Sequence, residues 1–309
     1  MLKTIGKKNH LSLGLVFPLE SYNGSIAKME NQEKLAKLAE DLGFKALWFR
    51  DVPFNDPSFG DAGQLYDPWI YMTHIMNHTK EIALATGSVI LPLRHPIHTA
   101  KSIQSLQQLS KGRIIVGIAS GDRPIEYPAF NYNLENKSEL FRDSFFYIKA
   151  LQKDFPVYQS KYYGKTDGRI DMLPKSQYHT PMLVTGHSGQ SLDWIATHAD
   201  GWLYYPRDFN FLKQTIANWS NALEKAEQSW KPYMQSLYID LLENKNASPK
   251  GIHLGFKSGT AYAIEHLHTL ESTGVNHVII NLKYGSRPAE IVIEELGKDV
   301  LPHLCSQFY

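Results

Sequence analysis

Eight short runs of apolar residues recur along the chain, and most of them are followed by a segment with helical spacing. Near-continuous Val, Ile and Leu runs that alternate with helices are typical of parallel strands covered on the outside. The predicted strands are residues 11–19, 45–52, 82–93, 113–121, 181–186, 201–206, 235–242 and 275–282. Helical spacing is clearest over residues 32–42, 68–77, 97–109 and 140–152.

Eight such units predict an α/β fold, a closed (β/α)8 TIM barrel that forms a single domain over residues 1–309. An open, doubly wound sheet would show a similar pattern, but it usually carries a glycine-rich turn after its first strand. Residues 18–24, which follow the first strand here, do not contain that dinucleotide-binding fingerprint. The barrel is therefore the favoured architecture.

The spacing of the strands is uneven, because the interval from Gly121 to Pro181 is much longer than one helix requires. We predict a long insertion after the fourth strand, over residues 123–180, which is rich in Tyr, Gly, Pro and Lys outside its helix. A long irregular excursion on a barrel is often an active-site lid or a dimer contact. A surface loop of no functional consequence is the alternative.

Charge and composition limit the kinds of molecule and compartment that we expect for this chain. The 309 residues include 32 Lys plus Arg and 31 Asp plus Glu, so no basic excess exists to favour a nucleic acid. No apolar run reaches the roughly 18 residues that a membrane span needs. The single cysteine, Cys305, excludes an internal disulfide framework and is compatible with a reducing compartment. We therefore expect a cytoplasmic protein without a membrane or nucleic-acid partner.

In a barrel the reactive groups lie at the carboxyl ends of the strands. Those ends offer Phe17, Glu20, Arg50, Asp51, Arg94, His95, Ser120, Gly121, Asp122, Thr185, Gly186, His187, Ser188, Tyr205, Arg207, Asp240, Glu243, Asn281 and Lys283. Arg50 and Arg94 either bind an anionic substrate or form ion pairs within the protein. His95 and His98 are three residues apart, but Pro96 lies between them and no third ligand is near, so no metal site is predicted.

Residues 184–202 combine a strand end, a short turn and the start of a helix. The sequence His-Ser-Gly-Gln-Ser follows Gly186, and a helix is predicted to begin near Ser191. Such a turn directs free backbone N–H groups and the positive end of a helix dipole at one point. Ser188 and Ser191 add hydroxyl donors, and Gly189 allows an anion to approach closely. The pattern suits a phosphate monoester, although serine in this place is also an ordinary helix N-cap.

Small residues interrupt the third predicted strand. Gly87 and Ser88 lie in a run that otherwise favours a strand, which indicates a bulge or the close passage of a flat ligand.

Residues 85–122, with Leu-Pro-Leu-Arg-His-Pro and Leu-Ser-Lys-Gly-Arg-Ile-Ile-Val-Gly-Ile-Ala-Ser-Gly, resemble the third-to-fourth strand segment of the bacterial luciferase-like flavin monooxygenases. Residues 184–202 are similar to the flavin-phosphate turn of that superfamily. The two motifs occur in the family's order, and the eight-strand series agrees over residues 10–305. Residues 50–69 look like an uncharacterised subgroup of TIM-barrel oxidoreductases within the superfamily.

The resemblance implies that FMN, or in some branches a deazaflavin, binds at the carboxyl end of the barrel. The implied phosphate contacts are His187, Ser188, Gly189 and Ser191, with Ser120 nearby. The implied contacts of the flavin ring are Thr86, Gly87 and Ser88. Members often have a non-proline cis peptide there, so the Gly87–Ser88 bond is predicted to be cis. The insertion over residues 123–180 would correspond to the family's mobile loop region, which shields the flavin from water.

The end of the second strand departs from the family pattern. Many members carry a Glu-His-His run there and use a histidine in catalysis, whereas this sequence has Asp51, Val52 and Pro53. Asp51 takes the place of the glutamate, and the histidine is missing. Asp51, then His95 and His187, are the nearest candidates for an acid or base. Each also has a structural interpretation: Asp51 capping a loop, His95 in an Arg-His-Pro turn, and His187 contacting phosphate.

The resemblance implies a flavin-dependent monooxygenase that uses reduced FMN and O2 to oxidise a small organic substrate. A separate NAD(P)H reductase would supply the reduced flavin, and a homodimer or tetramer is expected. One alternative is a non-catalytic flavin-binding protein of the same fold, suggested by the missing histidine. Another is a barrel hydrolase with paired carboxylates, Asp51 with Asp240 or Asp122, which would have to lie about 5 to 9 Å apart in a glycosidase.

Overall fold

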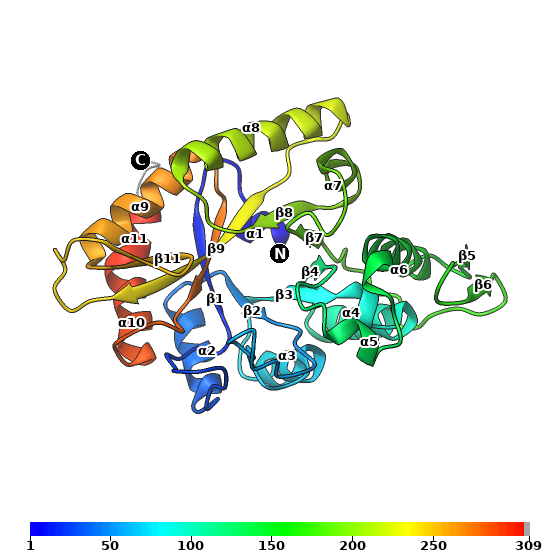
Figure 1. Cartoon of the computed structure of the whole chain (residues 1–309), viewed down its shortest axis with the longest axis horizontal. Coiled ribbons are helices and arrows are strands. Elements are labelled where there is room, and N and C mark those ends of the chain that lie inside the picture. Colours follow the sequence, from blue (N-terminus) through cyan, green and yellow to red (C-terminus); the bar gives the residue numbers. More distant parts are fainter. Residues whose placement is uncertain (306–309) are drawn as a thin grey trace.

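Eight parallel strands close into a barrel, as the sequence predicts, in the computed structural model, which describes residues 1–305 (Figure 1). The ring closes because β12 pairs with β9 on one side and with β1 on the other. The barrel strands in order around the ring are β1 (Ser12–Val16), β2 (Ala46–Phe49), β3 (Ala83–Ile90), β4 (Ile114–Ala119), β7 (Met182–Thr185), β8 (Gly201–Tyr204), β9 (Tyr233–Leu241) and β12 (His277–Asn281).

Each barrel strand is followed by helical structure, as a (β/α)8 fold requires. The helices that follow the strands are α2 (Gln32–Asp41), α3 (Pro68–Met76), α4 (Pro96–Leu109), α6 (Lys137–Leu151), α7 (Leu192–His198), α8 (Phe209–Lys225), α9 (Thr260–Thr273), α10 (Ala289–Glu295) and α11 (Leu301–Cys305). Three shorter turns are η1 (Leu91–Leu93) after β3, η2 (Leu134–Asn136) before α6 and the π-helical η3 (Leu296–Val300) before α11. Within residues 1–305, no helix is both long and apolar enough to cross a bilayer.

The barrel lumen contains a short chain of hydrogen bonds. The Ser12 hydroxyl donates to the Ile5 carbonyl at 2.6 Å and lies 2.6 Å from His277 Nδ1, while the Trp48 indole N–H donates to His277 Nε2 at 3.0 Å. These contacts are all satisfied when His277 is neutral with its proton on Nδ1. Complete burial lowers the pKa of His277 to about 3, which keeps this form.

The helix α1 (Leu2–Ile5) closes the N-terminal end of the lumen, because Ile5 belongs to the same buried cluster as the inward residues of the strands. Gly14 makes room in the lumen for the two rings above it. A side chain there would lie 2.7 Å from His277 Nε2 and 2.9 Å from the Trp48 indole nitrogen.

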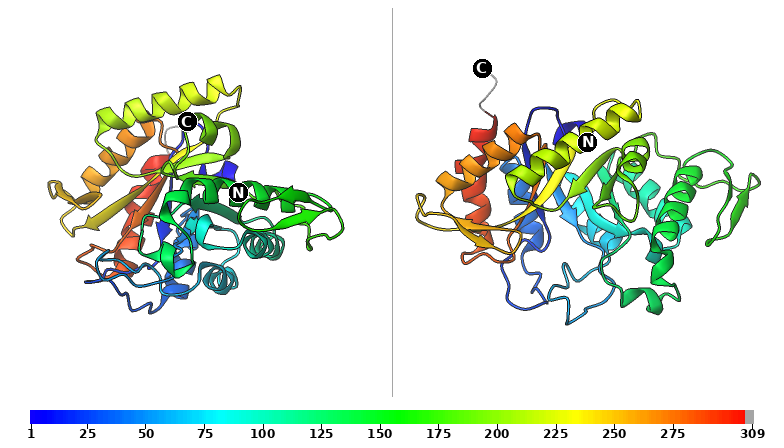
Figure 2. Two further views of the ribbon diagram at one scale, coloured as in Figure 1. Left: turned by 45° about the vertical axis from the view of Figure 1, so that its right-hand side comes forward. Right: turned by 45° about the horizontal axis from the view of Figure 1, so that its top comes forward.

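The insertion after β4 divides into two parts with different positions. Its first part, with the short helix α5 (Glu126–Ala129), lies next to the end of β4, and α6 then covers the barrel. Its second part is an antiparallel hairpin, β5 (Val157–Gln159) with β6 (Lys165–Asp167), that projects outward beyond α6 (Figures 1 and 2). The hairpin therefore does not cover the strand ends.

A second hairpin, which the sequence pattern did not predict, follows β9. The strands β10 (Lys250–Ile252) and β11 (Gly255–Ser258) are antiparallel to each other, and β11 extends the sheet by pairing with the last part of β9.

We predict that Gly117→Ala destabilises the barrel at the point where β3 meets β4. A Cβ at Gly117 would collide with the Thr86 carbonyl oxygen, which belongs to the neighbouring strand and cannot turn aside. Overpacking against backbone should lower the free energy of unfolding by about 3 kcal/mol in urea denaturation. The matched control is Gly251→Ala in β10, where a Cβ meets nothing within 4 Å. Equal stability of the two variants would contradict this packing.

Candidate functional site

Polar side chains gather on the inner side of the barrel at the carboxyl ends of the strands, which we call the mouth. Ala46 and Trp48 of β2 face the lumen, and successive side chains of a strand point to opposite faces, so the next inward position is Arg50. The same alternation, together with hydrogen bonds, places the other inward polar residues: Ser88, Thr185, Tyr205, Tyr238 and Lys283.

One half of the mouth, at β3, β4 and β7, is rich in hydroxyl groups. Ser88 and Thr185 hydrogen bond to each other through their hydroxyls. The Ser188 hydroxyl donates to the Thr185 carbonyl at 2.9 Å and accepts from the Ser120 amide at 3.2 Å. Tyr127 donates to the Ser120 carbonyl. The structure thus brings together Ser88, Ser120 and Ser188, three of the residues that the sequence assigns to the cofactor.

The turn after β7 has the geometry of an anion-binding concavity. Gly186, Ser188 and Gly189 have positive φ values of 58°, 49° and 72°. Within the described residues, the amides of His187, Ser188 and Gly189 make no hydrogen bond. Unpaired amides along a stretch that enters left-handed conformations form a concave donor set for an oxyanion.

The helix α7 begins at Leu192, one residue after the predicted start, and Ser191 is its N-cap. The Ser191 hydroxyl accepts from the Trp194 amide at 3.2 Å. Both interpretations of this serine therefore remain compatible, since a capping hydroxyl still lies beside the turn.

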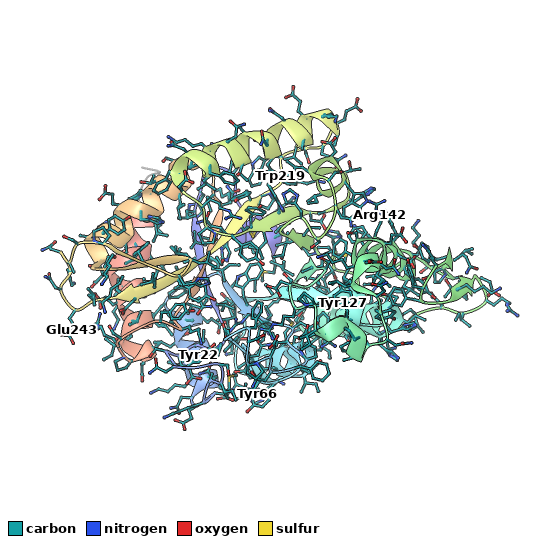
Figure 3. All side chains as sticks on the ribbon, viewed as in Figure 1. Tyr22, Tyr66, Tyr127, Arg142, Trp219 and Glu243 are labelled. Carbon is teal, nitrogen blue, oxygen red and sulfur yellow. The ribbon has the colours of Figure 1, made fainter. Side chains whose placement is uncertain are left out.

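Close packing against α6 also favours glycine at position 189, which the sequence did not reveal. A side chain there would collide with Ser138 Oγ at the start of α6. The Gln190 side chain fastens the same junction, because it donates to the Ser138 carbonyl at 3.0 Å and accepts from Arg142 Nε at 2.9 Å. Arg142 thus stands beside the turn with its terminal nitrogens unpaired in the described chain, and Figure 3 shows it between α6 and α7.

The Gly87–Ser88 peptide is cis, as predicted, and the register of β3 against β4 shifts between Thr86 and Val89. This shift is the predicted bulge. Thr86 itself faces away from the lumen, and its hydroxyl donates to the Gly117 carbonyl at 2.8 Å. Of the three residues predicted to lie against a flavin ring, Gly87 and Ser88 reach the mouth and the Thr86 side chain does not.

Asp51 is buried, and an ion pair occupies both of its carboxylate oxygens. Arg94 donates from Nε and Nη2 to Asp51 at 2.7 Å each, and the Ile90 amide donates at 3.1 Å. Arg94 also reaches Asp67, the N-cap of α3, at 2.7 Å. This network ties the end of β2 to the end of β3 and to α3, which is the structural interpretation of Asp51.

The two histidines lie at the edges of the site. His95 is the N-cap of α4, with its Nδ1 accepting from the Ile97 amide at 3.3 Å, and burial followed by the neighbouring His98 lowers the pKa of His95. His187 is exposed, with its ring 5.5 Å from Trp202 and 5.8 Å from Tyr204.

Glu126 of α5 is a buried acid that the sequence analysis missed. It is 3% exposed, and its Oε1 has no hydrogen-bond partner in the described chain. Arg123 Nη1 lies 4.0 Å from that oxygen. Burial raises the pKa of Glu126 to about 7, and the nearby Asp51 and Asp122 add to the effect, while Arg123 opposes it. No local motif marks this residue, because only the fold buries it.

The alternative hydrolase would pair Asp51 with Asp240 or Asp122. Asp51 is held by Arg94, whereas Asp240 accepts from Ser286 at 2.8 Å and from Lys257 at 2.8 Å. Asp51 and Asp240 are therefore neutralised in separate networks, and Asp122 is exposed.

The closed barrel, the bulge in β3 and the donor-rich turn after β7 define a (β/α)8-barrel protein with a polar ligand site at its mouth. Residues 12–238 match the luciferase-like monooxygenases, and the chain belongs to this family of oxidoreductases.

Two sequence relatives illustrate the range of similarity. The alpha chain of alkanal monooxygenase from Photorhabdus luminescens is 25% identical over 167 residues, which are 53% of this chain and 44% of the relative. An uncharacterised protein of Mycobacterium tuberculosis is 33% identical over 193 residues, 56% of this chain and 67% of the relative. The chain thus spans less than half the length of the alkanal monooxygenase that it matches.

Two solved structures share the fold over nearly the whole chain. An F420-dependent secondary alcohol dehydrogenase in complex with an F420–acetone adduct has a TM-score of 0.79 at 16% identity, covering 95% of this chain and 98% of that one. The oxygenating constituent of 3,6-diketocamphane monooxygenase from Pseudomonas putida, in complex with FMN, has a TM-score of 0.75 at 17% identity, with coverage of 95% and 98%.

We predict that Asp51→Asn lowers the stability of the fold more than it lowers the turnover rate. The substitution leaves Arg94 with only Asp67 as an ionic partner, so the free energy of unfolding should fall by about 3 kcal/mol in urea denaturation. Asp167→Asn is the control, because it removes an exposed ion pair with Arg169 and should change stability little. A variant of Asp51 with full stability but no turnover would instead make Asp51 an acid or base.

Proposed function

We propose that the chain is a flavin-dependent monooxygenase that uses reduced FMN and O2 to oxidise a small organic substrate at the mouth. The observation that carries the proposal is the set of unpaired amide donors in the turn after β7, which suits a phosphate monoester and lies next to a bulged strand, within a chain of the luciferase-like monooxygenase family. The flavin, when bound, supplies the redox chemistry, and the protein supplies binding, orientation and exclusion of water.

The residues of the turn fit the phosphate of FMN. The unpaired amides of His187, Ser188 and Gly189 provide backbone donors, and Ser191 lies at the start of α7. Arg142 provides a guanidinium whose Nε donates to Gln190, so its terminal N–H groups stay available to an anion beside the turn. A phosphate in this place also suits a deazaflavin coenzyme.

The bulge in β3 suits the flat ring. Beyond Ile115, the inward positions of β3 and β4 toward the mouth are small, at Ala85, Gly87 and Gly117, so these strands present little side-chain volume there. The Ser88 and Thr185 hydroxyls stand beside this surface and can orient the polar edge of the ring.

Glu126 is our proposed residue for holding and releasing a proton. Its Oε1 accepts no hydrogen bond in the described chain and has only Arg123 Nη1 at 4.0 Å, and its pKa of about 7 allows both protonation states near neutral pH. Asp51 and His95, the first candidates from the sequence, are committed to an ion pair and a helix cap. We propose positioning roles for both.

Two loops are proposed to exclude water from the mouth. Arg123 ties the segment after β2 to the segment after β4 by donating to the Phe54 carbonyl at 3.2 Å and to the Asp61 carbonyl. Its guanidinium also lies 4.3 Å from the centre of the Phe59 ring, and Phe54 contacts Phe130 at 6.0 Å between ring centroids. The shielding part of the insertion is then the stretch near α5, since the β5–β6 hairpin projects away.

We further propose that a separate NAD(P)H reductase delivers the reduced flavin and that the chain assembles as a homodimer or tetramer. Steady oxidation of NAD(P)H by the purified protein alone would contradict the first point, and a monomer in sedimentation would contradict the second. A flavin-binding protein without turnover would bind FMN equally well but oxidise no substrate in the presence of a reductase.

We predict that the wild-type protein prefers FMN to riboflavin, which lacks the phosphate, by about tenfold or more. Ser191→Asp should abolish this preference, because it keeps a capping side chain on α7 and places a negative charge beside the phosphate. Flavin fluorescence titration of both ligands measures the ratio.

Ser191→Asn is the matched control, since asparagine caps a helix equally well without a charge and should retain much of the preference. Equal affinities for FMN and riboflavin in the wild type would remove the phosphate from this turn. Binding of a deazaflavin coenzyme but not FMN would replace the monooxygenase with a deazaflavin-dependent oxidoreductase.

We predict that Glu126→Gln flattens the pH dependence of stability between pH 4.5 and 7. The folded pKa of Glu126, about 7, lies above its ordinary value of 4.5, so the unfolded chain loses this proton first as the pH rises. The stability that Glu126 contributes is complete below pH 4.5 and is lost as the pH rises through 7. Urea denaturation from pH 4.5 to 8 should show wild type losing stability relative to the glutamine variant, and parallel profiles would show that Glu126 has an ordinary pKa.

A further inference from the structure

The half of the mouth opposite the phosphate turn contains two cations that share one carboxylate. Arg50 follows β2 and Lys283 follows β12, and both face inward. Asp61 lies between them, with Oδ2 accepting from Arg50 Nη1 at 2.8 Å and Oδ1 standing 3.9 Å from Lys283 Nζ. Figure 3 shows Tyr22, which donates to this carboxylate, well apart from Tyr127 of the hydroxyl-rich half.

The cluster of Arg50, Lys283 and Asp61 has one net positive charge and is largely shielded from solvent. The side chains of Arg50, Lys283 and Asp61 are 17%, 4% and 13% exposed. The Asp61 carboxylate is already saturated, because Oδ1 accepts from the Tyr22 hydroxyl at 2.6 Å and the Gly63 amide at 3.0 Å. Buried charges are normally paired, so two cations that share one saturated carboxylate leave one positive charge that a second anion can balance.

Lys283 retains donors that the protein does not use. Its ammonium group has three N–H bonds, and one donates to the Gly24 carbonyl at 2.6 Å. The same group lies 3.8 Å from the centre of the Tyr22 ring, a cation–π contact. Burial lowers the pKa of Lys283, and the neighbouring Arg50 adds to this effect while Asp61 opposes it. Arg50 Nε, also buried, has no acceptor in the described chain.

Aromatic rings continue the surface beside the cations. Tyr238 and Tyr284 contact each other at 5.1 Å between centroids, and Lys283 Nζ lies 5.8 Å from the Tyr284 ring. Tyr284 is 40% exposed, so this side of the cluster opens to solvent. A planar organic body can pack on these rings while its charged group reaches the ammonium.

We propose that Arg50 and Lys283 bind the carboxylate or sulfonate group of an aromatic organic substrate at the mouth, an inference that rests on the proposed function for its place in turnover. The anion pairs with Lys283 and with the positive excess of the cluster. The phosphate turn and this cluster stand on opposite halves of the mouth, so cofactor and substrate each have their own anion site.

Calorimetry with benzoate, benzenesulfonate and benzyl alcohol, without flavin, tests the subsite directly. The two anions should bind at least about tenfold more tightly than the neutral alcohol, and added salt should weaken them. Lys283→Met should remove this preference, and Lys283→Arg should retain it. Lys231→Met is the matched control, because Lys231 is partly buried and, like Lys283, has its Nζ on a carbonyl, that of Ala196 at 2.6 Å, but lies before β9 at the other end of the barrel.

Equal binding of benzoate and benzyl alcohol to the wild type would overturn the proposal, and that comparison needs no variant to fold. Benzoate binding that survives Lys283→Met but is displaced by inorganic phosphate would assign the anion to the turn after β7 instead, which also overturns it. FMN titration of Lys283→Met should match wild type. If neither protein binds FMN while the benzoate preference holds, the proposed function fails and the anion subsite stands.

Discussion

The neutral imidazole of His277 in the barrel lumen fixes the position of the Trp48 ring, on which the bulged part of β3 rests. His277 accepts the Trp48 indole N–H and hydrogen bonds to Ser12, which in turn donates to α1 at the closed end. The Trp48 ring lies directly beneath Gly87, where a Cβ would sit 3.3 Å from Cε3 of the indole. The hydrogen-bond chain therefore fixes the ring on which the bulged part of β3 rests, and protonation of His277 would remove the acceptor for the indole.

Two adjacent residues at the end of β2, Arg50 and Asp51, point to opposite faces of the barrel and enter different ion-pair networks. Arg50 continues the inward face and joins Asp61 beside Lys283, whereas Asp51 points to the other face and pairs with Arg94. The inner cluster has two cations for one carboxylate. The outer cluster has two carboxylates for one cation, since Asp67 completes it. The buried acid of the outer cluster thus serves the fold, and the excess positive charge lies on the inward face, where we propose the substrate anion.

Local patterns were sufficient to predict the barrel strands, the start of α7 and the cis bond at Gly87–Ser88, because apolar runs, turn residues and family motifs are continuous in sequence. The partners of the site were not predictable in this way. Arg142 meets Gln190 from another element, and Lys283 meets the loop after β2 only when the barrel closes. Glu126 looks like an ordinary surface acid in sequence, and its raised pKa arises chiefly from burial, to which nearby carboxylates add.

The barrel alone does not determine the reaction, since two of the structures similar to this chain are named as a dehydrogenase and a monooxygenase although both share its fold. The phosphate turn lies inside the family match over residues 12–238, and so does Arg50. Lys283 and Tyr284 lie beyond it, on the segment that closes the ring. The half of the mouth proposed for the cofactor is thus built from the matched part, whereas the opposite half depends on β12. On the two proposals above, a change after β12 alters the substrate without disturbing the turn proposed to hold the phosphate.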